Sequence, residues 1–188
     1  SEEDILPRLT RNKRFAWISR KIPSDKAARI KAADINGIYI CEESKRNYPN
    51  DAMACHVLGF AGIDNTGLEG LEKQLDEDLR GEPGYSHMVK DAKRNTVLFK
   101  EDESVPPKNG HNVFLTIDSV IQYITEKELQ KAVTGSNASS GTAIVMQPHT
   151  GEVLAMANYP AYDLNSPGRA DAGVMKNAAV SSVLEPGS

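Results

Sequence analysis

The sequence predicts an α+β protein in which helices and strands are mixed along the chain. Of its 188 residues, 39% are apolar and 26% are charged, which is typical of globular proteins. Leucines recur at helical spacing with charged residues between them, at Leu68, Leu71, Leu75 and Leu79. Two apolar runs, residues 141–146 and 152–157, flank a four-residue stretch, residues 148–151, that has the length and the glycine of a hairpin loop. Helices mixed with an antiparallel hairpin define this fold class.

The first part of the chain is expected to hold short elements separated by turns. Residues 14–18 alternate around Phe15 and Trp17, as a half-buried strand does. Ser24 can cap a helix that Asn36-Gly37 would end in a left-handed turn. In order, we predict a strand at 14–18, a helix at 24–33, a strand at 38–41, irregular structure at 46–70, a helix at 68–79 ended by Gly81-Glu82-Pro83-Gly84, and two short strands near 88–89 and 96–99.

A domain boundary is predicted at Pro106-Pro107. Residues 100–112 resemble a linker, because consecutive prolines continue neither a helix nor a central strand. The chain is thereby divided into residues 1–106 and residues 107–188.

The second part is expected to begin with a strand and a long helix. Asp118 or Ser119 can cap this helix, and Ser119 and Gln122 stand in the register of a capping box. In order, we predict a strand at 113–117, the capped helix, a loop at 134–140, the hairpin of residues 141–157, and a loop-rich stretch at 158–188.

The charge distribution and the hydropathy of the chain indicate which partners to expect, namely whether it binds nucleic acid or spans a membrane. The net charge is −4, and residues 1–31 hold nine Lys or Arg against four acids, which leaves 13 (22 − 9) against 22 (26 − 4) in the rest. The two aromatic residues of this basic front, Phe15 and Trp17, do not form the interleaved series of a base-stacking platform, so we interpret the front as a solvated face and expect no nucleic acid partner. The apolar runs are far shorter than the roughly 20 residues of a membrane span, so we expect no membrane-spanning segment in this chain. Residues 1–4 resemble no secretory signal, so any export element would lie upstream, and we expect a piece of a longer protein.

The residues that could bind a metal or a cofactor are scattered. Cys41 and Cys55 form no Cys-x-x-Cys motif, and the four histidines lack the spacing of zinc ligands. The glycines between Gly62 and Gly70 are followed by no Gly-Lys-Ser/Thr and fit no calcium loop, so we interpret them as a structural turn. We expect no metal and no cofactor, and leave open whether the two cysteines form a disulfide or remain thiols.

Four residues were considered as candidates for chemistry. His56 lies in an apolar run beside a turn, where a hydrogen-bonded structural role is expected. Asp118 and Asp163 are explained as a helix cap and a turn residue. Ser188 follows Glu185-Pro186-Gly187, where a helix N-terminus could begin and favour negative charge near a nucleophile. Taken alone it is an ordinary serine, and its wider context decides its interpretation.

That context is a series of short motifs in a fixed order. They are Arg46-Asn47-Tyr48-Pro49, His56-Val57-Leu58-Gly59-Phe60-Ala61-Gly62, Gly67-Leu68-Glu69-Gly70-Leu71-Glu72, Gly81-Glu82-Pro83-Gly84, Pro106-Pro107 with Gly110, Leu115-Thr116-Ile117-Asp118 with Ile121-Gln122, residues 148–157, Tyr162-Asp163-Leu164-Asn165, and Asn177 leading to Glu185-Pro186-Gly187-Ser188. By this order and spacing the chain resembles the class B penicillin-binding proteins, the peptidoglycan D,D-transpeptidases of the FtsI/SpoVD type, along essentially its whole length.

The resemblance implies a domain plan and a catalytic residue. Residues 1–106 would be a non-catalytic pedestal domain of the dimerisation type, lacking its N-terminal part, and residues 107–188 the truncated start of a transpeptidase domain. Ser188 matches the nucleophile of the family's Ser-x-x-Lys motif. The Lys, the Ser-x-Asn motif and the Lys-Thr-Gly motif would lie downstream. We therefore expect this piece not to turn over and to bind penicillin negligibly.

The resemblance also implies an activity and partners for the parent protein. It would be a serine-type D-Ala-D-Ala transpeptidase that cross-links peptidoglycan stem peptides through an acyl-serine and is trapped by β-lactams. Expected protein partners are a membrane glycosyltransferase and proteins of a division or elongation complex, which shape the cell wall. The expected location is the extracytoplasmic face of the bacterial cytoplasmic membrane, with an anchoring N-terminal helix that is absent from this chain.

Two other hypotheses stay open. The piece could act as a non-catalytic interaction module that docks the enzyme to a glycosyltransferase or a division complex. A penicillin sensor or a β-lactamase relative would share Ser-x-x-Lys but would lack the pedestal motifs of residues 46–84. Because sheet partners of residues 141–157 would lie downstream, we also expect an unpaired strand edge and uncovered apolar surface. Residues 107–188 are therefore expected to be poorly ordered, self-associated or repacked in isolation.

Overall fold

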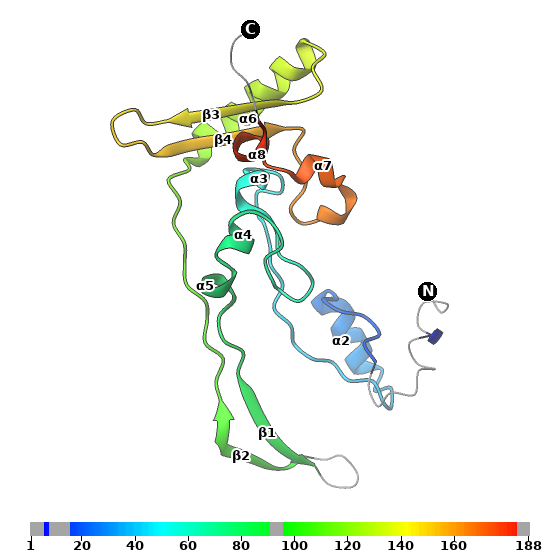
Figure 1. Ribbon diagram of the computed structural model, residues 1–188. Helices are drawn as coiled ribbons and strands as arrows, with labels where there is room; N and C mark the ends of the chain where they lie inside the picture. The colour runs from blue at the N-terminus through cyan, green and yellow to red at the C-terminus, as the bar shows by residue number, and fades with distance from the viewer. Residues whose placement is uncertain (1–5, 8–15, 91–95, 184–188) are drawn as a thin grey trace. The chain divides into compact units, whose positions relative to one another are not determined.

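The computed structural model describes residues 6–7, 16–90 and 96–183 (Figure 1). The chain divides into two compact units, Ser1–Arg46 and Asn47–Ser188, which we describe separately. Helices and strands are mixed as the α+β prediction requires. Among the described residues, no helix has the length and apolar character needed to cross a membrane.

The first unit contains helix α2, Ser24–Ala32, none of whose residues is buried. Ser24 was expected to cap this helix, but it is the first helical residue and Pro23 precedes it without a side-chain cap. The backbone turns left-handed at Asp34, where φ is 44°, earlier than the predicted Asn36-Gly37. An ion pair joins Arg20 to Glu43 at 2.6 Å.

Both strands predicted for the first unit are wrong where the structure describes them. Residues 16–18 and 38–41 form no strand, while Phe15 and the residue before it lie outside the described ranges. The amide of Ile38 bonds instead to the carbonyl of Ile35 in a turn. Alternating side chains make a strand only when a neighbour accepts the ladder hydrogen bonds, and the described part of this unit offers none.

The second unit begins with short helices and a long hairpin. Its elements are α3 (Cys55–Leu58), α4 (Gly70–Gln74), α5 (Asp76–Arg80), β1 (Tyr85–Lys90) and β2 (Thr96–Val105), with β1 and β2 antiparallel. The helix predicted at 68–79 is broken at Leu75. The break places the Asp76 carboxylate 2.7 Å from the Gly67 amide, a bond to a distant turn that leucine spacing does not encode.

The stretch predicted to be a linker is largely paired. Strand β2 extends to Val105, past the predicted end at residue 99. Beyond the prolines, Lys108 and Glu82 exchange two backbone hydrogen bonds of 2.9 Å, and their side chains form an exposed ion pair. A narrow antiparallel ribbon has two free edges, so prolines are tolerated where a central strand would exclude them.

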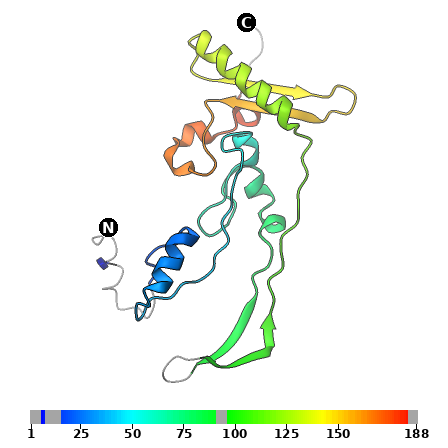
Figure 2. The ribbon, with the colours of Figure 1, turned by 180° about the vertical axis from the view of Figure 1, so that it is seen from behind.

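Helix α6 (Ser119–Gly135) and the hairpin of β3 (Gly141–Met146) and β4 (Val153–Tyr159) form a layer in the second unit. Helix α6 packs on one face of the hairpin and α8 (Ala178–Ser181) on the other, as the two opposite views show (Figures 1 and 2). A Cβ on Gly141 would lie 2.6 Å from Val133 of α6, so only glycine allows this close packing. The hairpin and the helix are confirmed.

The entry into α6 differs from the prediction. Residues 113–117 form no strand, but Thr116 Oγ1 donates to the Val153 carbonyl and the Asp118 amide donates to the Leu154 carbonyl. This stretch follows β4 through single hydrogen bonds and does not build a ladder. The Asp118 carboxylate caps α6 by accepting from the amides of Val120 and Ile121, both at 2.9 Å.

The last described stretch is folded into short helical turns. It contains a 3₁₀ turn, Pro167–Arg169, then α7, Ala172–Met175, and α8. The prediction of a loop-rich end is confirmed as far as the structure describes it. Apolar side chains of β3 are exposed, with Ile144 46% and Met146 54% accessible, as expected for uncovered apolar surface.

Candidate functional site

The predicted nucleophile Ser188 lies outside the described residues, so the structure defines the framework that leads to it. We call residues 160–183 the lead segment, because they are the described part of the chain between β4 and Ser188. The residues that hold this segment come from its own turns, from β4, and from the stretch between Tyr48 and Phe60.

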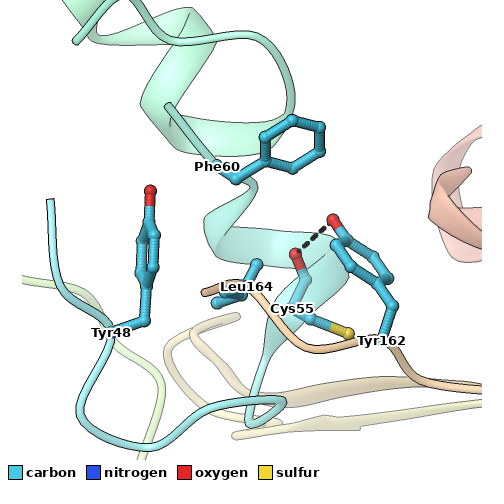
Figure 3. Packing of buried hydrophobic residues seen from close by; sticks show 5 residues of the cluster. All are labelled: Tyr48, Cys55, Phe60, Tyr162 and Leu164. Atoms are coloured by element: carbon cyan, nitrogen blue, oxygen red, sulfur yellow. Dashed lines mark hydrogen bonds between the residues drawn. The ribbon is translucent and has the colours of Figure 1, made fainter. Parts of the chain in front are cut away.

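Five buried side chains form the core against which the lead segment packs (Figure 3). We call this cluster the junction: Tyr48, Cys55, Phe60, Tyr162 and Leu164. The Tyr162 ring meets the Phe60 ring edge-on with centroids 6.2 Å apart, and its hydroxyl donates to the Cys55 carbonyl at 3.1 Å. Aromatic contacts of this kind add to the stabilisation from burial. The junction joins stretches that are more than 100 residues apart in sequence.

Asn165 fastens the lead segment to Tyr48 through the backbone. Its side-chain oxygen accepts from the Tyr48 amide at 3.1 Å, and its side-chain nitrogen donates to the Tyr48 carbonyl at 2.8 Å. The same nitrogen reaches the Asp51 carboxylate at 3.0 Å. One amide therefore pairs with both backbone groups of Tyr48, as a neighbouring strand would.

His56 contacts the lead segment at three places. Its Nε2 lies 2.7 Å from the Val174 carbonyl, its own carbonyl accepts from Asn177 Nδ2 at 3.2 Å, and its ring stands edge-on to Tyr162 at 5.3 Å. Because Nε2 faces a carbonyl, it must carry the proton. Nδ1, 3.2 Å from Cys55 Sγ, is then free to accept from the thiol.

The burial of these groups suppresses their reactivity. Desolvation lowers the pKa of His56 below 6.5, so the ring is neutral at pH 7. Burial also raises the pKa of the Cys55 thiol to about 11 and raises that of Tyr162. A thiol with so high a pKa is a poor nucleophile. The structural interpretation of His56 is confirmed, because both its ring and its carbonyl are hydrogen-bonded within the fold.

Two asparagines fix the start of α8. Asn177 Oδ1 accepts from the Ala179 amide at 3.2 Å, which caps the helix, and from Asn158 Nδ2 at 2.9 Å. Asn158 Oδ1 accepts in turn from the Ala179 amide and from Thr142 Oγ1. The last described helix is thereby bound to β4 through Asn158 and, by way of Asn158, to Thr142 of β3.

Gln122 of α6 binds the outer edge of β4. It is fully buried, and its side-chain amide exchanges two hydrogen bonds with the backbone of Met156, at 2.8 and 3.0 Å. Gln122 Nε2 also donates to Glu126, whose carboxylate accepts from the Ala54 amide at 2.8 Å. The expected unpaired edge is therefore partly covered by this chain itself, and the predicted capping-box role of Gln122 is wrong.

A close backbone contact stabilises the turn that carries His56. Gly59 has φ 68°, and a Cβ there would lie 1.8 Å from the Glu69 carbonyl oxygen. Only glycine fits this crossing. Within the stretch between Gly62 and Gly70, the Gly62 amide donates to the Thr66 carbonyl at 2.8 Å and the Asn65 amide donates to the Gly62 carbonyl at 3.0 Å, so these glycines belong to a structural turn, as predicted.

The other candidate residues have structural roles. Asp163 Oδ1 accepts from the Asn165 amide at 2.8 Å, the turn role predicted for it. Both Cys41 and Cys55 are free thiols. In the described ranges no three His, Cys, Asp or Glu side chains gather as metal ligands. The roles of Asn158, Asn165, Asn177 and Glu126 were missed, since their partners are distant and the only signal was their place in or near short motifs.

Comparison with known proteins identifies the family. Residues 1–115 match the Penicillin-binding Protein dimerisation domain, and residues 141–188 match the Penicillin binding protein transpeptidase domain. The chain belongs to the penicillin-binding proteins. Neither match sets the predicted boundary at Pro106-Pro107, which stays a prediction.

Relatives of this penicillin-binding protein chain share its sequence over nearly all of its length. It is 41% identical to the probable peptidoglycan D,D-transpeptidase PenA of Neisseria meningitidis, covering 95% of this chain and 31% of that protein. It is 41% identical to stage V sporulation protein D of Bacillus subtilis, covering 100% of this chain and 30% of that protein. It is 38% identical to peptidoglycan D,D-transpeptidase FtsI of Escherichia coli, covering 93% of this chain and 29% of that protein. The chain thus spans about a third of the length of these relatives.

Solved penicillin-binding proteins share the fold. Penicillin binding protein 3 of Mycobacterium tuberculosis superposes with a TM-score of 0.60 at 36% identity, over 76% of this chain and 28% of that one. The complex between PBP2 and MreC from Helicobacter pylori superposes with a TM-score of 0.62 at 26% identity, and the match covers 88% of this chain and 34% of that one. The predicted resemblance to class B proteins of the FtsI/SpoVD type is confirmed.

Proposed function

We propose that this chain is part of a penicillin-binding peptidoglycan D,D-transpeptidase and that Ser188 is its acyl-serine nucleophile. The observation that carries the proposal is the transpeptidase-domain match that runs to Glu185-Pro186-Gly187-Ser188, in a chain whose relatives are named D,D-transpeptidases. The parent protein would act in bacterial cell-wall synthesis. This piece alone is expected to be inactive, because its catalytic partners would lie beyond Ser188.

The proposed reaction proceeds in two steps. Ser188 Oγ attacks the carbonyl carbon of the penultimate D-Ala of a stem peptide, and its proton passes to a lysine three positions further on. The bond to the terminal D-Ala breaks, D-Ala leaves with a proton on its amine, and an acyl-serine remains. The amine of a second stem peptide then attacks the acyl carbon, the ester bond to Ser188 Oγ breaks, the cross-linking amide bond forms, and the proton lost by the amine returns to Ser188 Oγ. A β-lactam acylates the same oxygen.

The described framework is suited to support such a nucleophile without taking part in the chemistry. Helix α8 is capped by Asn177 and tied to β4 through Asn158. A serine nucleophile needs a fixed position relative to its base and to the oxyanion donors. The framework would supply this fixed position from the N-terminal side.

The decisive test uses the protein continued to the stop codon of its gene. After exposure to a β-lactam, intact mass should show one adduct, and peptide mapping should place it on Ser188. The Ser188→Ala variant, folded by circular dichroism, should form no adduct. A folded wild-type protein that stays unlabelled, or an adduct elsewhere, contradicts the proposal.

A second candidate is an interaction module that docks the enzyme to its partners. It is favoured by the dimerisation-domain match over residues 1–115 and by the similarity to PBP2 in complex with MreC. Partners of this chain would be a membrane glycosyltransferase and division or elongation proteins, at the extracytoplasmic face of the cytoplasmic membrane. Residues 1–106 should then capture a membrane synthase specifically in pull-down. A control protein of matched net charge should not capture the synthase, and equal capture by the control would contradict the interaction module.

A further inference from the structure

His56 is a buried polar residue whose contacts lie largely outside its own short helix. Its ring bonds to the Val174 carbonyl in α7, and its carbonyl binds the side chain of Asn177 just before α8. It is 7% exposed. A buried donor such as Nε2 loses its water on folding and regains a partner only if the Val174 carbonyl is in place. The contact therefore favours one position of α7.

Asn177 extends this constraint to α8. The Asn177 side chain uses both of its ends: the oxygen caps Ala179 and accepts from Asn158, and the nitrogen donates to the His56 carbonyl. The start of α8 is thus fixed from β4 on one side and from α3 on the other. Figure 1 shows α3, α7 and α8 close to one another.

These contacts join the two family matches. His56 lies within the dimerisation-domain match, whereas Val174 and Asn177 lie within the transpeptidase match that runs to Ser188. Moving the His56 turn would break the bonds to both. A shift of the His56 turn would therefore change the position from which α8 starts.

We propose that His56 and Asn177 are positioning residues that set how fast Ser188 is acylated, so that the dimerisation part of the chain controls the nucleophile through one latch. The inference rests on the proposed function of Ser188. The latch consists of the His56 Nε2 bond to Val174 and the Asn177 Nδ2 bond to His56. Neither residue touches substrate in this scheme.

The test measures acylation of the full-length protein by a fluorescent penicillin, separating the pre-acylation dissociation constant from the acylation rate constant. His56→Asn cannot reach Val174, whereas His56→Gln places an amide nitrogen near the position of Nε2. Loss of one bond of about 1.4 kcal/mol corresponds to a tenfold change. We expect His56→Asn to slow the acylation rate constant about tenfold with an unchanged dissociation constant, and His56→Gln to restore it to within about threefold.

Two further variants separate positioning from stability. Asn177→Asp keeps the acceptor that caps α8 but replaces the donor to the His56 carbonyl, so it should slow acylation like His56→Asn. Asn165→Ala removes two bonds between the lead segment and Tyr48 without touching the latch. It should lower the melting temperature and leave the acylation rate constant unchanged.

The outcomes distinguish this inference from the proposed function. If the wild type is not acylated at Ser188, the proposed function fails. If the wild type is acylated and folded His56→Asn and Asn177→Asp react at its rate, the latch is overturned. The latch is equally overturned if Asn165→Ala slows acylation as much as they do, because general loosening would then explain the effect.

Discussion

The junction and the layer of α6, β3 and β4 lie in the same unit but are assembled from different ranges of sequence. The layer is formed by one continuous stretch, residues 119–159, whose elements follow each other through short loops. The junction joins Tyr48, Cys55 and Phe60 to Tyr162 and Leu164 across more than 100 residues. Local sequence patterns therefore predict the elements of the layer, but they do not predict which residues meet in the junction.

The two regions also differ in what holds them. The layer depends on the close packing of Val133 of α6 against Gly141 and on a side-chain amide that pairs with the β4 backbone. The junction combines aromatic packing with a buried hydrogen bond from Tyr162, and the adjoining His56 adds an edge-on ring contact to Tyr162 and a hydrogen bond to Val174. A buried polar contact is specific because an unmatched partner is costly. We infer that the junction fixes the position of the lead segment, while the layer supports α8.

The largest expected effect is on the junction core. Replacing Tyr162 by Ala removes a buried aromatic side chain and should lower the free energy of unfolding by about 3–5 kcal/mol, measured by urea unfolding of the full-length protein. Tyr162→Phe keeps the ring and loses only the bond to the Cys55 carbonyl, at a cost of about 1 kcal/mol. Equal losses in the two variants would show that packing does not dominate here.

The next largest effect concerns the layer. Gln122→Ala leaves the Met156 amide and carbonyl without their side-chain partner and should destabilise by about 2–3 kcal/mol. Hydrogen exchange should show faster exchange at the Met156 amide than in the wild type. The neighbouring exposed Val120, changed to Ala, should cost less than about 0.5 kcal/mol. Unchanged exchange at Met156 in Gln122→Ala would argue against its role at the β4 edge.

A smaller effect is expected at the start of α6. Asp118→Ala removes a carboxylate that caps two amides and should cost about 1 kcal/mol in thermal or urea unfolding. Ser119→Ala, at the first helical position, should change stability by only a few tenths of that amount. A cost at Ser119 as large as at Asp118 would reverse the assignment of the cap.

The smallest effect is the pH dependence of stability that His56, beside the junction, contributes. The pKa of His56 lies below 6.5 in the folded protein because burial disfavours the charged ring. The unfolded chain then binds the proton more readily, so the contribution of His56 is fully present above pH 6.5 and is lost as the pH falls through the folded pKa. The wild-type melting temperature should fall more steeply below pH 6.5 than that of His56→Gln. Parallel profiles would contradict this.

Sequence patterns predicted the elements whose cause is local. The hairpin of β3 and β4, helix α6 and helix α2 follow from periodicity and turn residues, and Asp118 caps α6 as its position suggested. The strands expected at residues 38–41 and 113–117 are absent, since an apolar run becomes a strand only beside a partner. The candidate nucleophile Ser188 was identified from the order of the motifs, and motif order does not give distances between side chains.

The sequence by itself determined the fold class, the family and the candidate nucleophile Ser188, because periodicity and motif order are properties of the chain alone. Only the tertiary structure decided that His56 faces Val174, that Asn165 pairs with Tyr48, and that Gln122 binds β4. The physical reason is that a polar side chain can satisfy its hydrogen bonds with many partners. Which partner it has depends on the folding of distant stretches against one another.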